Sequence, residues 1–188
     1  AGGAEALRGA GVMVEGGILR SAAAAQNAPF LGGWRTPERP WVALKLATSL
    51  DGRIADRFGR SRWISGEPAR DFVHWLRAGM DAIGVGGATA RADDPSLTVR
   101  GAVEPRAVPL RVIFDQAGNL PTTLEVLRTA RERPTCVVAG PLLSSERAAA
   151  IDESGARLLR SNSLHHGLTE LRRLGITSIV VEGGGQLA

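Results

Sequence analysis

The stretch AIGVGGATARADDPSLTVR (82–100) places a strand-length apolar run, a glycine-rich turn and an acidic pair in direct succession. Residues 82–87 have the length and composition of a buried strand, and the glycines follow at its end. Asp93 and Asp94 precede Pro95, and an Asp-Pro pair initiates turns because the aspartate side chain can bond its own backbone. We therefore expect a strand, then a glycine-rich turn, then a loop whose simplest interpretation is a surface turn.

The same kind of apolar run recurs on both sides of this stretch, at 41–49, 110–115, 135–140, 156–161 and 177–185. Helical spacing behind a serine or glycine cap predicts helices at about 67–79, 144–153 and 163–175. Asp51-Gly52, just after the first run, predicts a tight turn. Strands that alternate with helices in this way are typical of an α/β protein with a mostly parallel sheet covered by helices on both faces.

Composition indicates a globular protein, with 44% hydrophobic and 22% charged residues among 188. No apolar run approaches the roughly 18 residues that span a bilayer, so we expect no membrane segment. A single cysteine, Cys136, excludes an intramolecular disulfide and suits a reducing cytoplasm. The three histidines and one cysteine do not form a zinc pattern, so we expect no metal site and interpret the histidines as exposed or packing residues.

Several residues can carry chemistry, although each also has an ordinary structural interpretation. The glycine-rich turns at 84–89 and 182–188 follow strands, where bare backbone lets N–H groups approach a phosphate; each can equally be a plain strand-to-helix connection. Lys45 interrupts an apolar strand, which is costly unless its ammonium reaches a cleft or an anion. A hydroxyl, an indole and two guanidinium groups complete a set that suits phosphates and flat rings: Ser61, Trp63, Arg77 and Arg100.

At this point the chain resembles a known family. The segments LKLATSLDGRIA (44–55), SRWIS (61–65), Leu76-Arg77, ATARADDPSLTVR (88–100) and VVEGGG (180–185) occur in the order and spacing of the reductase domain of the bifunctional riboflavin-biosynthesis deaminase/reductase. The resemblance covers about 40–188, and residues 1–39 resemble the end of the preceding deaminase domain and its linker. That tail lacks the zinc motif, so deamination is not expected. The family's C-terminal helix and final strands have no counterpart in this chain.

The resemblance implies a dihydrofolate-reductase-like fold and NADPH-dependent reduction of 5-amino-6-(5-phosphoribosylamino)uracil to the ribitylamino compound. It implies that Lys45 lies near the reduced sugar carbon, and it makes Asp93 the candidate for stabilising a cationic imine or relaying its proton. Substrate positions are matched by Ser61, Arg77, Leu97, Arg100 and Glu182. Cofactor positions are matched by Ala47, Trp63, Thr89, Asp93 and the turn that contains Gly184, Gly185 and Gln186.

Two alternatives stay open on the sequence. The first is a related reductase of the same fold that acts on another pterin or pyrimidine. The second is a basic nucleic-acid-binding module, suggested by the sequence pI of about 10.7. Against the module, the arginines are scattered, no nucleic-acid motif occurs, and the formal charge is only +4. We expect a cytoplasmic homo-oligomer that binds a small phosphoribosyl pyrimidine, with no nucleic acid or membrane partner.

Overall fold

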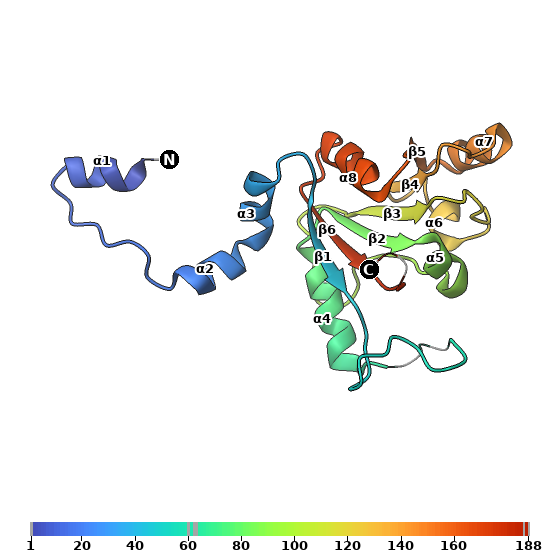
Figure 1. The fold of residues 1–188 in the computed structure, drawn as a ribbon, viewed down its shortest axis with the longest axis horizontal. Coiled ribbons are helices and arrows are strands. Elements are labelled where there is room, and N and C mark those ends of the chain that lie inside the picture. Colours follow the sequence, from blue (N-terminus) through green and yellow to red (C-terminus); the bar gives the residue numbers. More distant parts are fainter. Residues whose placement is uncertain (1, 60, 62–63, 186, 188) are drawn as a thin grey trace.

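The computed structural model describes residues 2–59, 61, 64–185 and 187. Its centre is one sheet of six strands in the order β1-β6-β2-β3-β4-β5 (Figure 1). Every neighbouring pair of strands is parallel. The strands are β1 (Trp41–Lys45), β2 (Ala82–Gly86), β3 (Leu110–Asp115), β4 (Thr135–Ala139), β5 (Arg157–Arg160) and β6 (Ser178–Glu182). The predicted parallel α/β architecture is confirmed.

Helices connect the strands, and separate helices before β1 form an N-terminal arm. The connecting helices are α4 (Glu67–Ala78), α5 (Gly87–Asp93), α6 (Glu125–Arg128), α7 (Ser145–Ser154) and α8 (Leu164–Arg173). As predicted, a serine caps each of the last two: Ser144 accepts the N–H of Arg147, and Ser163 accepts the N–H of His166. The arm contains α1 (Gly3–Gly9), α2 (Arg20–Gln26) and α3 (Ala28–Arg35).

The order of the strands explains which helices cover which face. From β1 to β5 the chain crosses the sheet in one direction, and α4 to α7 contribute residues to the core on one face, which we call face A. From β5 to β6 it returns in the opposite direction, and α8 packs on the other face. Since crossovers between parallel strands keep a right-handed sense, reversing the direction moves the helix to the opposite face.

The N-terminal arm extends away from the sheet (Figure 1). None of the residues described in α1 to α3 is buried. The contact nearest the sheet is at Gly32, which lies against the indole of Trp41 at the start of β1. The arm therefore contributes little to the core around the sheet.

Three details differ from the sequence predictions. Residues 87–93 form α5, whereas we expected a turn and a loop, because the alanines favour a helix and Asp94-Pro95 ends it only afterwards. β1 ends at Lys45, so residues 46–49 lie outside the strand. Phe72, expected on the apolar side of α4, is 59% exposed and stacks on Trp75. No helix among the described residues is long and apolar enough to cross a membrane.

Candidate active site at the carboxyl edge of the sheet

The carboxyl ends of β1 and β6 bring Lys45 and Glu182 together. The two residues are register partners on neighbouring parallel strands. Side chains alternate along a strand, and Ala43 and Val180, two residues earlier in each strand, belong to the core on face A. Lys45 and Glu182 therefore project from that face. The two residues, which the resemblance places near the sugar and at a substrate position, thus lie on one side of the sheet.

Glu182 is held by Arg77, which reaches it from α4. The Nε and Nη2 atoms of Arg77 donate to the two carboxylate oxygens at 2.6 and 2.7 Å. Both side chains are only 11% exposed, so the pair is shielded from solvent. The Nη1 atom of Arg77 also donates to the carbonyl oxygen of Thr98 at 2.8 Å. Two of the predicted substrate residues thus bind each other, and the fork of Arg77 fixes the orientation of the Glu182 carboxylate.

The glycine-rich turn after β6 lies beside the start of α5 at this edge. Gly184 has φ of +80°, and a Cβ added there would lie 2.9 Å from the hydroxyl oxygen of Thr89 in α5. A Cβ at Gly185 would lie 3.1 Å from Ile54 of the segment that follows β1. A side chain at either position would press against its neighbour, so glycine is what allows the turn to pack this closely. The structure therefore brings together the predicted cofactor residues Thr89, Gly184 and Gly185.

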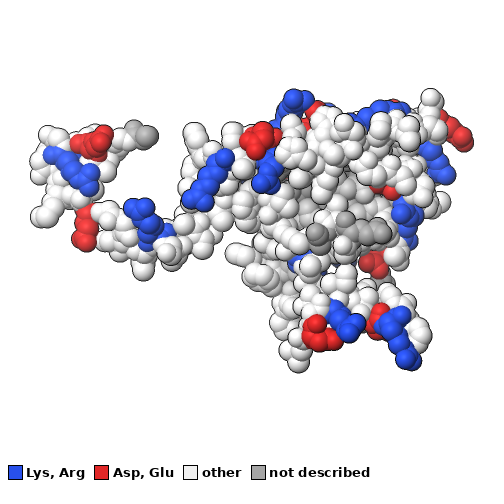
Figure 2. Space-filling view, viewed as in Figure 1, with Lys and Arg blue, Asp and Glu red and all other residues white. Residues whose placement is uncertain are grey.

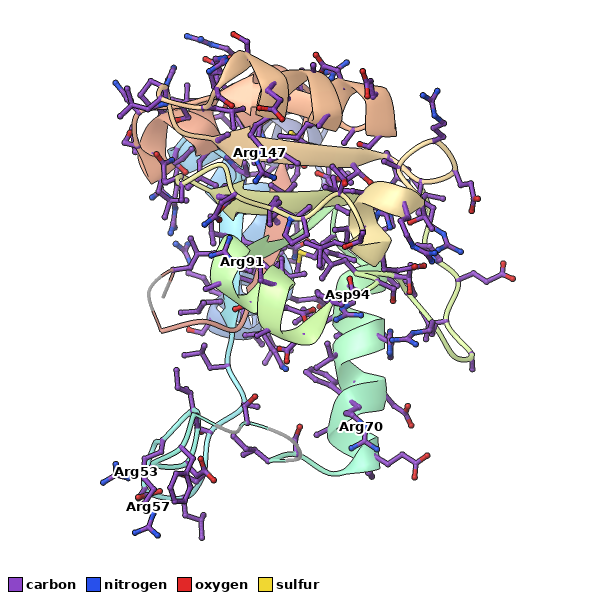
Figure 3. The ribbon with its side chains drawn as sticks, turned by 90° about the vertical axis from the view of Figure 1, so that its right-hand side faces the viewer. Arg53, Arg57, Arg70, Arg91, Asp94 and Arg147 are labelled. Atoms are coloured by element: carbon purple, nitrogen blue, oxygen red, sulfur yellow. The ribbon has the colours of Figure 1, made fainter. Side chains whose placement is uncertain are left out.

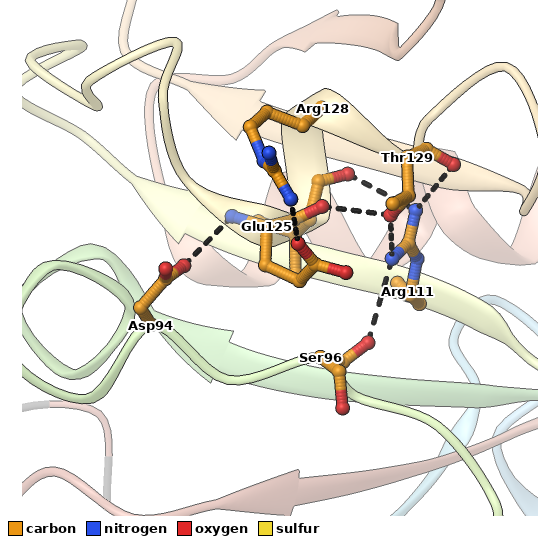
Figure 4. Close-up of polar contacts among 7 residues, drawn as sticks. Asp94, Ser96, Arg111, Glu125, Arg128 and Thr129 are labelled. Atoms are coloured by element: carbon orange, nitrogen blue, oxygen red, sulfur yellow. Dashed lines mark hydrogen bonds and ion pairs between the residues drawn. The ribbon is translucent and has the colours of Figure 1, made fainter.

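Asp93 and Asp94, the acidic pair within residues 82–100, have different surroundings. Asp93 ends α5 and is half-buried on the same side as Thr89. Asp94 adopts a left-handed backbone, and its carboxylate accepts the N–H of Glu125 at the start of α6 at 2.7 Å. Figure 4 shows this contact. Asp94 thus anchors the chain just after Asp93, which agrees with the turn-forming role that we assigned to it.

The segment after Asp94 runs along face A from the carboxyl edge of the sheet toward the amino edge, where β3 begins. Leu97 is 2% exposed and has φ of +49°, a left-handed conformation that is unusual for a residue with a side chain. The N–H of Arg100 donates to Nδ1 of His74 on α4 at 3.1 Å. The backbone of the predicted substrate residue Arg100 is therefore fixed to the helix that carries Arg77, and buried Leu97 precedes this fixed segment.

Two further predicted residues lie on the segment between β1 and α4. Ala47 is half-buried, and Ser61 is exposed. The Asp51-Gly52 turn forms as predicted: Gly52 has φ of +77°, and Ser49 and Arg53 bond across it. Figure 3 shows Arg53 at the far tip of this segment. Two predicted cofactor residues, Trp63 and Gln186, lie outside the described residues.

Two buried polar groups of β3 were not singled out from the sequence, one at the carboxyl end of the strand and one near its amino end. Asp115, at the end of β3, is 3% exposed; it pairs with Arg91 of α5 at 3.1 Å and accepts the N–H of Asn119 at 2.8 Å. Figure 3 places Arg91 on α5. The sequence signal that could have identified Asp115 is an aspartate at the end of an apolar run that forms a parallel strand. This contact attaches α5 to β3 and so holds Thr89 and Asp93 at the edge of the sheet.

The other group is Arg111 in β3, which is 1% exposed. Its guanidinium donates to hydroxyl and carbonyl oxygens of Thr129, Thr135 and Val126, among others, and more weakly to the carbonyl of Ser96 at 3.4 Å (Figure 4). Burial lowers the pKa of Arg111 to about 10. A pocket of about 400 Å³, lined by residues 96–100 together with Arg111 and Arg133, lies between this network and the loop that carries Leu97.

Charge on the face shown in Figure 2 is mixed, with Lys and Arg interspersed among Asp and Glu. No continuous basic stripe of the kind that tracks a nucleic-acid backbone is visible on that face. Within the described part of the chain, no group of three His, Cys, Asp or Glu residues is placed to hold a metal ion.

An open parallel sheet with polar side chains and glycines at its carboxyl edge places the chain among the α/β proteins, a class in which ligands commonly bind at that edge. The family described as the RibD C-terminal domain matches residues 40–188. The chain therefore belongs to the RibD C-terminal domain family.

Curated and solved relatives agree with this family. The chain is 37% identical over 184 residues to the riboflavin biosynthesis protein RibD of Aquifex aeolicus, covering 97% of this chain and 50% of the relative. The Acinetobacter baumannii RibD structure matches all of this chain and 52% of its own, with 36% identity and a TM-score of 0.76. A deaminase/reductase from Thermotoga maritima matches 97% of this chain and 50% of its own, with 30% identity and a TM-score of 0.73. The chain thus spans about half the length of these relatives.

Proposed function

We propose that this chain carries the reductase site for NADPH-dependent conversion of 5-amino-6-(5-phosphoribosylamino)uracil to 5-amino-6-(5-phosphoribitylamino)uracil in riboflavin biosynthesis. The Thermotoga maritima relative is named as a 5-amino-6-(5-phosphoribosylamino)uracil reductase. The observation that carries the proposal is the meeting of Lys45, the Arg77–Glu182 pair and the Thr89–Gly184 contact at one edge of the sheet. A substrate sugar and a cofactor can meet in line at such an edge.

The glycine turn fits a nucleotide cofactor. Gly184 and Gly185 pack closely against Thr89 and Ile54, and the lack of side chains there lets backbone N–H groups approach a phosphate. Thr89 presents a hydroxyl beside this turn and can donate to a phosphate or ribose oxygen. When bound there, NADPH supplies the hydride.

The side chains of the site account for the remaining chemistry. The open-chain form of the substrate has a C1′=N imine, and the Lys45 ammonium donates a proton to its nitrogen. Asp93 then stabilises the positive charge of the iminium ion until a hydride adds at C1′, the electron pair of the C=N bond returns to nitrogen, and a secondary amine results. Lys45 regains its proton from solvent. Arg77 holds the Glu182 carboxylate as an acceptor for substrate N–H or O–H groups, and Arg100 binds the phosphate.

A titration tests this function against the two alternatives. The account predicts saturable NADPH binding by the chain at physiological salt, and consumption of NADPH only when the phosphoribosylamino pyrimidine is added. Consumption with a pterin in its place would favour a related reductase of the same fold. DNA affinity that falls steeply with added salt, without NADPH binding, would contradict a reductase and favour the basic binding module.

The rest of our assignment concerns the setting of this site. We propose that residues 1–39 are the tail and linker of a preceding deaminase domain and that residues 40–188 form the reductase domain. The exposed α1 to α3 support this division, because they add few buried residues to the sheet. We further propose a homo-oligomer in the cytoplasm; the single cysteine, Cys136, is buried and unpaired, which suits a reducing compartment.

A further inference from the structure

Two side chains of α4 form hydrogen bonds with the backbone of residues 98–100, one with an N–H group and one with a carbonyl oxygen. His74 accepts the N–H of Arg100 through Nδ1 at 3.1 Å, and Arg77 donates to the carbonyl of Thr98 at 2.8 Å. Residues three apart on a helix face the same way, so His74 and Arg77 form one surface against which residues 98–100 lie. The segment thus has one backbone donor and one backbone acceptor fixed by side chains of the helix.

The segment needs such support because its preceding residue is strained. Leu97 is buried with φ of +49°, a conformation that carries a steric cost for a residue with a Cβ. A strained residue stays in place only where its surroundings hold it there. Contacts from His74 and Arg77 lie within three residues of Leu97, and they supply this restraint.

The hydrogen bond to Arg100 requires a neutral imidazole. Nδ1 can accept only when it carries no proton, so the ring proton lies on Nε2. Burial lowers the pKa of His74, and the nearby charges of Arg77 and Arg100 lower it further, while Glu182 opposes them to a smaller extent. His74 therefore stays an acceptor at neutral pH, and it loses this capacity only as the pH falls below its ordinary value of 6.5.

We propose that His74 is a positioning residue for the reductase: its neutral imidazole fixes residues 98–100 and so presents Arg100 to the phosphoribosyl substrate. The proposal rests on the function proposed above. His74 acts through the loop and does not touch the reacting atoms. The loop carries substrate residues, whereas Thr89 and the glycine turn carry the cofactor, so His74 selectively affects substrate binding.

Steady-state kinetics with matched variants test this role. His74→Leu removes the acceptor, whereas His74→Asn keeps an oxygen close to the position of Nδ1; His165→Leu, at an exposed histidine of α8, is the control. We expect His74→Leu to raise KM for the pyrimidine by about tenfold, the effect of one hydrogen bond, and to change KM for NADPH by less than about twofold. His74→Asn should restore most of the loss, and His165→Leu should match the wild type.

The pH profile supplies a second readout. In the wild type, KM for the pyrimidine should rise as the pH falls below about 6.5, because the protonated imidazole repels the N–H of Arg100 and adds charge beside Arg77. The rise should be smaller in His74→Asn, where only the substrate phosphate still takes up a proton in this range. Equal effects on both KM values, or a His74→Asn variant no better than His74→Leu, would overturn the proposal.

Hydrogen exchange separates this proposal from the proposed function. In the ligand-free chain, the peptide that contains residues 98–100 should exchange faster in His74→Leu than in the wild type and at the wild-type rate in His165→Leu. Unchanged exchange in His74→Leu would overturn the positioning role even if the enzyme is active. Absence of any reductase activity in the folded wild type would contradict the proposed function, while the exchange experiment would still decide whether His74 fixes the loop.

Discussion

The pair formed by Arg77 and Glu182 allows a quantitative prediction. The two side chains are only 11% exposed and share two hydrogen bonds of 2.6 and 2.7 Å. Removing one partner leaves the other charge poorly solvated, which typically costs about 3–5 kcal/mol. Since the whole free energy of unfolding of a domain is about 5–15 kcal/mol, either Arg77→Met or Glu182→Leu should remove a large share of it.

The double variant Arg77→Met/Glu182→Leu should be much more stable than either single variant. Replacing a buried ion pair by apolar residues is often neutral, and the added loss is one hydrogen bond to Thr98, about 1 kcal/mol. Urea unfolding followed by circular dichroism measures all three differences. The control is Arg173→Ala, which breaks a surface pair with Glu170 and should cost about 0–1 kcal/mol because Arg173 is 69% exposed.

The result that would refute this reasoning is simple additivity. If the double variant lost the sum of the two single losses, the pair would not act as a unit, and each residue would be stabilised by other contacts. Single losses as small as that of Arg173→Ala would show that solvent screens the pair despite its low exposure.

Four further predictions concern the site and the core. Asp93→Asn should leave NADPH binding nearly intact and cut turnover sharply, as single-turnover kinetics would show; unchanged turnover would refute its proposed role. Arg111→Met should lower the free energy of unfolding by about 3–5 kcal/mol, because it leaves several buried carbonyl and hydroxyl groups without their donor; a loss below about 1 kcal/mol in urea unfolding would disprove this. Burial raises the pKa of Asp81, but hydrogen bonds from Thr177 and Ser178 lower it by more in sum, so the carboxylate stabilises the fold above its ordinary pKa of 3.8. Asp81→Asn should therefore cost about 1 kcal/mol at neutral pH, and the difference from wild type should vanish as the pH falls well below 3.8; a difference independent of pH would count against it. Burial also raises the pKa of Cys136 to about 12, so a thiol reagent at pH 8 should label it only after unfolding, and rapid labelling of the folded chain would contradict its burial.

Much of the fold could be predicted because a parallel sheet buries its strands on both faces. Runs such as LRVIFD (110–115) and TCVVAG (135–140) are apolar almost throughout, and they form β3 and β4 close to the expected bounds. Residues 87–93 were assigned wrongly because glycine and Asp-Pro signals outweighed the helix propensity of the alanines between them. The carboxyl edge was predictable in part, since residues that end parallel strands gather at one side of the sheet.

The roles of charged side chains were harder to predict. From the sequence alone, Arg77 and Arg100 can equally be solvated surface charges, and only the folded chain shows Arg77 bound to Glu182, 105 residues away. We interpreted His74 as an exposed or packing residue, since nothing local indicates that its acceptor would meet the backbone of Arg100. Arg111 is likewise buried by contacts from α6 and β4 that no short pattern records.

Deuterium transfer tests the central claim most directly, namely that the carboxyl edge around Lys45, Asp93 and Glu182 is where the sugar is reduced. The chain would be incubated with the phosphoribosylamino pyrimidine and NADPH deuterated at either face of C4, and the product examined by mass spectrometry. The account predicts one deuterium at C1′ of the ribityl product from one of the two labelled cofactors, with the yield lost in Asp93→Asn. Recovery of unreduced substrate from the folded wild type, or transfer unaffected by Asp93→Asn, would contradict it.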